Sequence, residues 1–452
     1  MIGDLAQRID QRTPADRDRY FDFLRAASIL LVVIGHWCVR VVTVEDGQMQ
    51  TDHLLNIAPW THWLTPVFQV MPIFFIVGAV LNVTSWRRAM DEGVSRSDWT
   101  RKRARRLLRP MIVFLLVVIP IAVLISLIWG DAIVFGADFV VVPLWFLAAY
   151  LIFTALTPLF LALHKKIGGM RLLVGACLFT LLIDLLSLEG FPADLIPVTY
   201  SELKYVNFVL VWPSIYLLGV LWADGKMPSR AASLVMLTAV SILVLLLMLV
   251  SAAYPVSFIP TALGPNNSMP PTAALFALAF TQLGLLLLAR AAITRLLEKP
   301  RAWALVAIPG SRLVTIFLWH QAVIAGVAVL IYPTGLWPTS PEVDAVWYAL
   351  RVPWLLVCGI ALVPVVMLFG RFESATEVRP SRLQGRAAVF ADALGIVLIS
   401  VALVLFIQDG ISNPDAPLHL PLLPILLLLT GLLALGVVGE KLTAKEGKRG
   451  DV

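Results

Sequence analysis

Charged residues are scarce in this chain. Only 14% of its 452 residues are Asp, Glu, Lys or Arg, whereas soluble domains carry about 25%. This shortage excludes an ordinary soluble globular protein of this length, and the 59% hydrophobic content and the mean hydropathy of +0.87 agree with that exclusion. The composition therefore predicts an integral membrane protein, whose chemistry takes place inside a helix bundle or at its two faces.

Cysteine is also scarce. Cys38, Cys177 and Cys358 all fall inside apolar runs without the spacing of metal ligands, so we predict neither a disulfide framework nor a metal site, and no bound cofactor. The first twenty residues are polar and lack the apolar core of a signal peptide, which predicts that the first span is retained. We find no repeat of fixed period, and each hydrophilic segment is too short to form a domain of its own.

Long apolar runs dominate what is present. A helix needs about 20 such residues to cross a bilayer. We therefore predict an all-α polytopic membrane bundle of about twelve transmembrane helices. The predicted spans are 21–43, 62–83, 108–130, 143–163, 170–188, 206–223, 231–251, 272–290, 312–332, 345–369, 388–407 and 421–439.

Basic residues are divided unequally between the segments that connect these spans. With the N-terminus inside, 32 of the 35 Lys and Arg residues lie on the cytoplasmic side, and only Arg40, Lys204 and Arg351 lie on the other side. Because cytoplasmic loops carry an excess of Lys and Arg, both termini are predicted to be cytoplasmic. The net charge of +6 then reflects topology and does not indicate nucleic-acid binding.

The first span carries an arginine and a histidine eleven residues apart, Arg25 and His36. At about 100° per residue both side chains lie on one face of a helix, roughly 16 Å apart along its axis. A histidine at membrane depth is costly unless it is paired or lines a cavity, so His36 is a candidate functional residue. The structural alternative is a capped helix start followed by a histidine that is bonded to a neighbouring helix.

Two further features contain residues suited to a reaction. Arg106 and Arg109 are spaced i, i+3 before Pro110, so they can hold one anionic group, although cytoplasmic loops are basic for topological reasons as well. His320 lies about eight residues into the ninth span, at a depth near that of His36, and the two histidines can face one cavity. Packing of His320 against another helix is the alternative.

One uncharged segment on the predicted outer side is rich in proline. It runs from Ala252 to Thr272, contains five prolines and cannot form a continuous helix. Its composition suits a rigid lid over a cavity or a re-entrant hairpin. Tyr332, Trp337 and Trp347 on the same side could stack on a sugar, although anchoring at the membrane interface explains them equally well.

Taken together, these motifs resemble the membrane-bound acyltransferase-3 family, and the order and spacing of the set carry the resemblance. The motifs are Asp22-Phe-Leu-Arg25 followed by ten residues and His36, Pro72-Ile-Phe-Phe-Ile-Val-Gly78, Arg106-Leu-Leu-Arg109-Pro, Pro143-Leu-Trp-Phe-Leu and Phe317-Leu-Trp-His320. The resemblance covers about residues 18 to 370. Val77 departs from it, because the family usually has serine before that glycine.

The resemblance implies a ten-helix bundle that takes an acyl group, often acetyl, from cytoplasmic acyl-coenzyme A and transfers it to a hydroxyl of an envelope glycan or glycolipid outside. It implies that Arg25 and His36 belong to the transfer site and that Arg106 and Arg109 bind the donor. We predict His320 as a further catalytic residue from its depth, near that of His36. Its partners would be the lipid bilayer, acyl-coenzyme A and the acceptor, and its location the inner membrane of a bacterium.

Domain boundaries follow from the same comparison. The predicted organisation is a cytoplasmic segment 1–18, a ten-helix membrane domain 19–370, a linker 371–387, two additional helices 388–439 and a tail 440–452. No soluble esterase-like domain is fused to this chain, so no relay through such a domain is expected.

A twelve-span transporter or flippase is the alternative from another functional class, because histidines within the membrane can relay protons. Transporters of this size are often built from two related halves. Arg25 and His36 have no counterpart in spans 7 to 9. The sequence therefore favours the acyltransferase.

Overall fold

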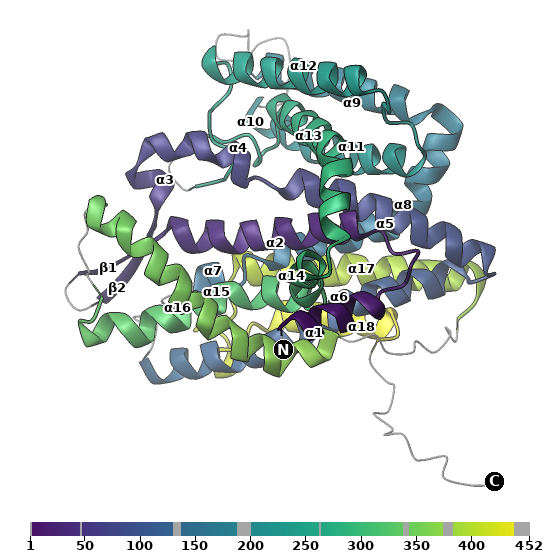
Figure 1. Ribbon diagram of the computed structural model, residues 1–452. Helices are drawn as coiled ribbons and strands as arrows, with labels where there is room; N and C mark the ends of the chain where they lie inside the picture. The colour runs from purple at the N-terminus through teal and green to yellow at the C-terminus, as the bar shows by residue number, and fades with distance from the viewer. Residues whose placement is uncertain are drawn as a thin grey trace.

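The computed structural model describes residues 2–45, 48–129, 137–187, 200–261, 264–337, 343–373 and 383–437. Long helices fill most of these ranges, and the only sheet they contain is a two-stranded hairpin (Figure 1). Eleven helices in the described ranges are long and apolar enough to cross a membrane. The prediction of an all-α polytopic membrane protein is confirmed.

The spanning helices follow the predicted order. They are α2 (Arg19–Val39), α5 (Met71–Asp91), α6 (Arg96–Trp129), α8 (Leu144–Ile167), α9 (Gly169–Leu186), α11 (Asn207–Ala223), α12 (Ala231–Val250), α13 (Ala273–Leu297), α15 (Leu313–Ile331), α16 (Ala345–Phe369) and α17 (Gly385–Gln408). The twelfth predicted span is only a 13-residue apolar helix, α18 (Leu422–Ala434). At 1.5 Å per residue it is about 20 Å long and falls short of a bilayer core.

Short elements connect the long helices. They are α1 (Ile2–Gln11), β1 (Arg40–Glu45), β2 (Gln48–His53), α3 (Leu54–Ile57), η1 (Pro59–Leu64), α4 (Thr65–Phe68), α7 (Ala137–Val140), α10 (Tyr200–Leu203), η4 (Lys204–Val206), α14 (Pro300–Gly310), η5 (Tyr332–Thr334), η6 (Gly370–Glu373) and η7 (Pro417–His419). The antiparallel hairpin β1–β2 was not predicted, and it ends the first helix at Val39 rather than at residue 43.

Helix α2 lies inside the bundle. Its start is fixed by Asp18, whose side chain accepts a hydrogen bond from the Tyr20 backbone amide at 3.0 Å, which satisfies one of the free donors of a helix N-terminus. The helix then packs against α5, α13, α15 and α16. In Figure 1 it crosses the middle of the bundle and runs into the hairpin β1–β2 at the left. This placement puts side chains from the middle of α2 among other helices.

The two ends of the bundle differ in charge. We call the end that contains the starts of α2 and α6 the basic face, and the end that contains the β1–β2 hairpin the opposite face. Ion pairs join side chains at the basic face, for example Arg290 with Asp18 and Arg19 with Asp10. The basic face is therefore the one predicted to be cytoplasmic. Its orientation in a cell stays a prediction.

Helices differ in how far they are covered by protein. Within an apolar stretch of 18 residues, 67% of the residues are buried in the spans that contain α11 and α15, against 11% in the span that contains α16. Helix α15, with the motif Phe317-Leu-Trp-His320, is therefore central. The predicted linker 371–387 is described only at its ends, and the predicted tail 440–452 lies outside the described residues.

Candidate active site

Two histidines from distant parts of the chain meet inside the bundle. Nδ1 of His36 on α2 lies 2.8 Å from Nε2 of His320 on α15, and the two rings are nearly parallel, with centroids 5.1 Å apart. His320 is fully buried, whereas His36 keeps part of its surface accessible. The arrangement matches the expectation that both histidines face one site, and His36 is the member that a reactant can reach.

The hydrogen bonds around this pair assign its protons. Nδ1 of His320 lies 2.5 Å from the carbonyl oxygen of Phe317, and a carbonyl can only accept, so this nitrogen carries the hydrogen. Nε2 of neutral His320 is then an acceptor, and Nδ1 of His36 donates to it. The remaining nitrogen of neutral His36, Nε2, therefore carries a lone pair. It has no hydrogen-bond partner among the described residues.

Gln321 is a third polar group at this site. Its amide nitrogen is placed 3.1 Å from Nδ1 of His36, and its amide oxygen is buried without a partner. In that orientation the amide nitrogen of Gln321 and Nδ1 of His36, both hydrogen-bond donors, would face each other. Amide orientation is assigned from the network, so we assign the oxygen to the position beside His36. Gln321 then accepts from the same hydrogen as His320. The sequence analysis did not single it out, although a His-Gln pair within an apolar helix is a signal for such a site.

Neighbouring groups fix the two rings in place. The indole nitrogen of Trp37 donates to the backbone carbonyl of His320 at 2.9 Å, which ties α2 to α15 at the level of the histidines. The ring of Phe317 lies 5.7 Å from that of His320 and packs edge-on against Phe146 of α8. Rings held in this way keep the lone pair of His36 in one direction, as catalysis by a positioned base requires.

Arginines cluster near the start of α2. Arg25 lies 3.8 Å from Asp22, its nearest acidic partner, and Asp22 also bonds Arg17 at 2.6 Å. Arg103, whose guanidinium donates to the Leu81 carbonyl at 2.8 Å, interacts electrostatically with both Arg25 and Arg106. Arg25, Arg103 and Arg106 therefore form a cationic cluster at the basic face. The sequence analysis did not single out Arg103, because it lies in a basic segment whose charge is already explained by the excess of Lys and Arg in cytoplasmic loops.

The two arginines predicted to bind the donor differ in position. Arg106 is exposed and Arg109 is half-buried, and neither bonds to another described side chain. Arg106 joins the cationic cluster, whereas Arg109 lies almost one turn further along α6, outside the interactions that define the cluster. Both guanidinium groups remain available to an anion.

The proline-rich segment folds back onto the bundle. As predicted, its described residues form no long helix. The side-chain amide of Gln69 donates to the carbonyl of Phe258 at 2.7 Å, and Thr65 accepts from the Phe258 amide at 2.9 Å. Asp184 accepts hydrogen bonds from the hydroxyl of Tyr254 at 3.0 Å and from the backbone amide of Ala273 at 2.7 Å. These bonds hold both ends of the segment against helices.

The second span approaches α8 closely at its glycine. A Cβ atom at Gly78 would lie 2.6 Å from the ring of Tyr150, so a side chain here would have to displace that ring. Val77, the departure from the family pattern, is buried in the same core. Phe74 and Phe75 pack against Phe146.

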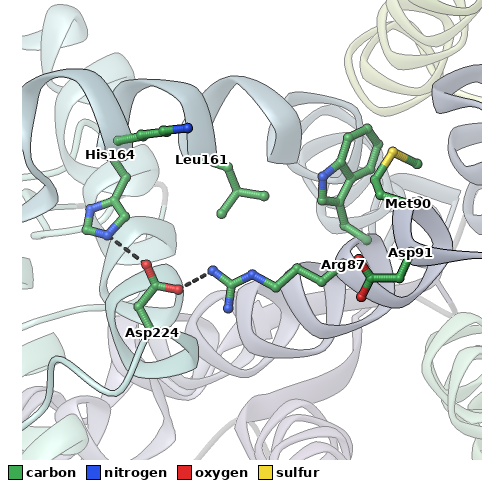
Figure 2. A pocket seen from close by; sticks show the side chains of 8 residues that line it. Arg87, Met90, Asp91, Leu161, His164 and Asp224 are labelled. Atoms are coloured by element: carbon green, nitrogen blue, oxygen red, sulfur yellow. Dashed lines mark hydrogen bonds and ion pairs between the residues drawn. The ribbon is translucent and has the colours of Figure 1, made fainter.

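A separate recess of about 450 Å³ opens at the basic face. Figure 2 shows Arg87 and His164 both reaching Asp224 from different helices. Nε2 of His164 lies 2.8 Å from Asp224, and its Nδ1 accepts from the amide of Gly169 at 2.8 Å. Because these side chains are paired with one another, the recess is a junction at which α5, α8 and α11 are joined, and the histidine pair does not line it.

Within the described ranges, no group of three or more His, Cys, Asp or Glu side chains is placed to hold a metal ion. The histidine pair itself offers a neutral imidazole with a free lone pair, hydrogen-bonded to a second imidazole.

Comparison with known proteins agrees with this geometry. The acyltransferase-3 family model, described as an acyltransferase domain, matches residues 18–371, more than three quarters of the chain. The protein belongs to this family and is a membrane acyltransferase. The match ends before α17. No curated protein matches the chain, and no solved structure does.

Proposed function

We propose that this acyltransferase takes an acyl group from acyl-coenzyme A at the basic face, which faces the cytoplasm, and transfers it to a hydroxyl group that enters from the opposite face. The accessible lone pair on Nε2 of His36 is the observation that carries the proposal. Acetyl is the proposed acyl group and a bacterial inner membrane the proposed location. The acceptor is an envelope glycan or glycolipid.

The arginines support the donor side of this proposal. Coenzyme A carries several phosphates, and Arg guanidinium groups bind phosphate through paired hydrogen bonds. Arg25, Arg103 and Arg106 gather positive charge where the donor would enter, and Arg106 and Arg109 have free guanidinium groups. Arg25 and His36 share α2, so a donor held at the start of this helix can extend its thioester towards the histidine.

The transfer step then uses the proton arrangement described above. Nε2 of His36 accepts the proton of the acceptor hydroxyl while the hydroxyl oxygen attacks the thioester carbon. The carbon–sulfur bond breaks, and the imidazolium returns its proton to the departing thiolate to give coenzyme A. His320 stabilises the imidazolium by accepting from its Nδ1–H. In the covalent variant, Nε2 attacks the thioester carbon, the carbon–sulfur bond breaks and the thiolate leaves. The acceptor hydroxyl then attacks the acyl-imidazole, the carbon–nitrogen bond breaks, and the hydroxyl proton passes to the thiolate.

The test is one-sided transfer in sealed vesicles. The purified protein is reconstituted with envelope extract, its orientation is determined, and labelled acetyl-coenzyme A is supplied on one side only. We expect labelled acceptor only when the donor meets the basic face. Transfer with the donor on the other face would overturn the proposed orientation. Movement of extract components without acylation would support a transporter.

A further inference from the structure

Helix α14 (Pro300–Gly310) connects two spanning helices at the basic face. It joins the end of α13 to the start of α15. The end of α13 lies at the basic face, where Arg19 of α2 donates to the Leu297 carbonyl at 2.9 Å. With 11 residues, α14 is about 16 Å long, which is too short to cross a bilayer core. It therefore makes this connection without crossing the membrane.

The two sides of α14 differ in what covers them. Trp303 and Val306 are buried, and the indole nitrogen of Trp303 donates to the hydroxyl of Thr13 at 2.7 Å. Leu305 and Ile308, in contrast, are 77% and 53% exposed. Exposed apolar side chains on a short helix at a membrane face are typical of a helix that contacts lipid. We therefore expect acyl chains beside Leu305 and Ile308.

A recess of about 500 Å³ lies next to this apolar surface. Helices α1 and α14 lie side by side (Figure 1), and the recess is formed between them. Among the described residues that line it, two are basic and none is acidic. The lining residues are Gly3, Gln7, Lys299, Pro300, Arg301, Ala302 and Leu305.

The two basic side chains are available to a ligand. Lys299 and Arg301 are exposed, and neither bonds to another described side chain. Other basic residues of this face, such as Arg19 and Arg290, are already paired with carboxylates. Exposed cations in a cytoplasmic loop need only water, so their charge alone does not define a ligand.

The apolar part of the lining narrows the chemistry. Pro300 and Leu305 line the same recess as the two cations, and the exposed surface of α14 continues from Leu305 to Ile308. A soluble anion would use the cations and leave this apolar surface in water. A phospholipid has a phosphate for the cations and an acyl chain for the apolar surface, so it matches both parts.

We propose that the recess between α1 and α14 binds an anionic phospholipid from the leaflet at the basic face. Its phosphate lies between Lys299 and Arg301, and one acyl chain runs along Leu305 and Ile308. The amide of Gln7 is a hydrogen-bonding group for the polar part of the headgroup. The site is separate from the histidine pair, and the proposal does not depend on acyl transfer.

Binding of single lipids to the purified protein tests the site. The protein is kept in a neutral detergent and titrated with phosphatidylglycerol or phosphatidylcholine of identical acyl chains, and native mass spectrometry gives the Kd of the first bound lipid. We expect phosphatidylglycerol to bind about tenfold more tightly or better, because it adds net negative charge beside two cations. Equal affinities for the two lipids would overturn the proposal.

Variants locate the binding. Lys299→Gln with Arg301→Gln should weaken phosphatidylglycerol by about tenfold and leave phosphatidylcholine unchanged. The matched control is Lys226→Gln with Arg230→Gln, which removes two exposed basic residues of the same face that do not line the recess. This control should bind as the parent does. Unchanged affinity in the first double variant, or an equal loss in both, would contradict the proposal.

Two further arms separate a lipid from a soluble anion. Leu305→Asn should weaken phosphatidylglycerol but not glycerol 1-phosphate, which has no acyl chain. Phosphatidylglycerol affinity that is unchanged by Leu305→Asn and lost on adding inorganic phosphate would assign the recess to a free anion and contradict the proposal. Displacement of the lipid by coenzyme A would assign the recess to the acyl donor and would contradict it as well. Acyl transfer is not measured in any arm, so a failure of the proposed function would leave these results unaffected.

Discussion

Nε of Arg101 donates to Oδ1 of Asp392 at 2.6 Å, and this buried ion pair fastens α17 to α6. The hydroxyl of Ser97 bonds the other oxygen of the same carboxylate. Helix α17 lies beyond the region that matches the family, and it packs against both α6 and α8 (Figure 1). The pair therefore connects the additional helices to the helix that carries Arg103, Arg106 and Arg109.

Replacing Asp392 by Leu should destabilise the protein by about 3–5 kcal/mol, because Arg101 is then buried without a counter-charge. Unfolding in sodium dodecyl sulfate, followed by circular dichroism, measures this loss. The double variant Arg101→Met, Asp392→Leu should recover most of the stability. If the single variant were as stable as the parent, the ion pair would not be what joins these helices.

His36→Gln should lower acyl transfer by about two to four orders of magnitude, the usual contribution of general acid–base catalysis. Glutamine keeps a polar group of similar size but can neither take up a proton near neutral pH nor form an acyl-imidazole. The measurement is turnover, with donor affinity and melting temperature determined in parallel and both expected to stay at parent values. His419→Gln is the control. Near-normal turnover in a folded His36→Gln protein would remove His36 from the mechanism.

His320 should assist catalysis through the hydrogen bond that its Nε2 accepts from Nδ1–H of His36. His320→Gln can still offer an acceptor oxygen to Nδ1 of His36, whereas His320→Leu cannot. We expect kcat to fall in both variants, more in the leucine variant, with KM for acyl-coenzyme A unchanged. A purely structural His320 would give equal losses in kcat, or a change in KM as well, when the two variants have equal stability.

Arg106→Ala with Arg109→Ala should raise the apparent Kd for acyl-coenzyme A by at least tenfold while leaving acceptor binding unchanged. Lysine at both positions should restore only part of the affinity, since it lacks the planar fork of arginine. The matched control is Arg295→Ala with Arg301→Ala, which removes two exposed arginines elsewhere on the basic face. Unchanged donor affinity in the first double variant would assign Arg106 and Arg109 to topology alone.

The β1–β2 hairpin should loosen as the pH falls from about 6.5 towards 4. Burial, followed by the nearby Arg40 charge, lowers the pKa of His53 from 6.5 to about 4, against the smaller opposing effect of Asp52. Nδ1 of neutral His53 accepts from the amide of Leu55 at 3.3 Å. The unfolded hairpin binds more protons in this range, so the stability present above pH 6.5 is lost on acidification.

Hydrogen exchange of residues 40–58, corrected for intrinsic rates, measures this effect at pH 7 and pH 5. His62, whose charge also acts on His53, is kept in both proteins. His53→Asn should remove the difference between the two pH values. A pH dependence that persists in that variant would assign it to another group.

The sequence by itself determined the fold class and the composition of the two faces. Apolar runs of spanning length are sufficient to define helices, because an unsatisfied backbone cannot cross a bilayer. They fixed eleven of the twelve expected spans, and the eleven-residue spacing fixed Arg25 and His36 on one helix. The exception is α18, whose helix ends at Ala434, whereas the predicted span continues to residue 439.

Only the tertiary structure decided which residues meet. His36 and His320 are 284 residues apart, and nothing local specifies their 2.8 Å contact, which depends on how α2 packs against α15. The carbonyl of Phe317 fixes the hydrogen of His320 on Nδ1, and this leaves the lone pair of His36 on Nε2. The same packing sets the position of that carbonyl. Spacing along one helix is set by covalent geometry, whereas contacts between helices depend on side chains from many parts of the chain at once.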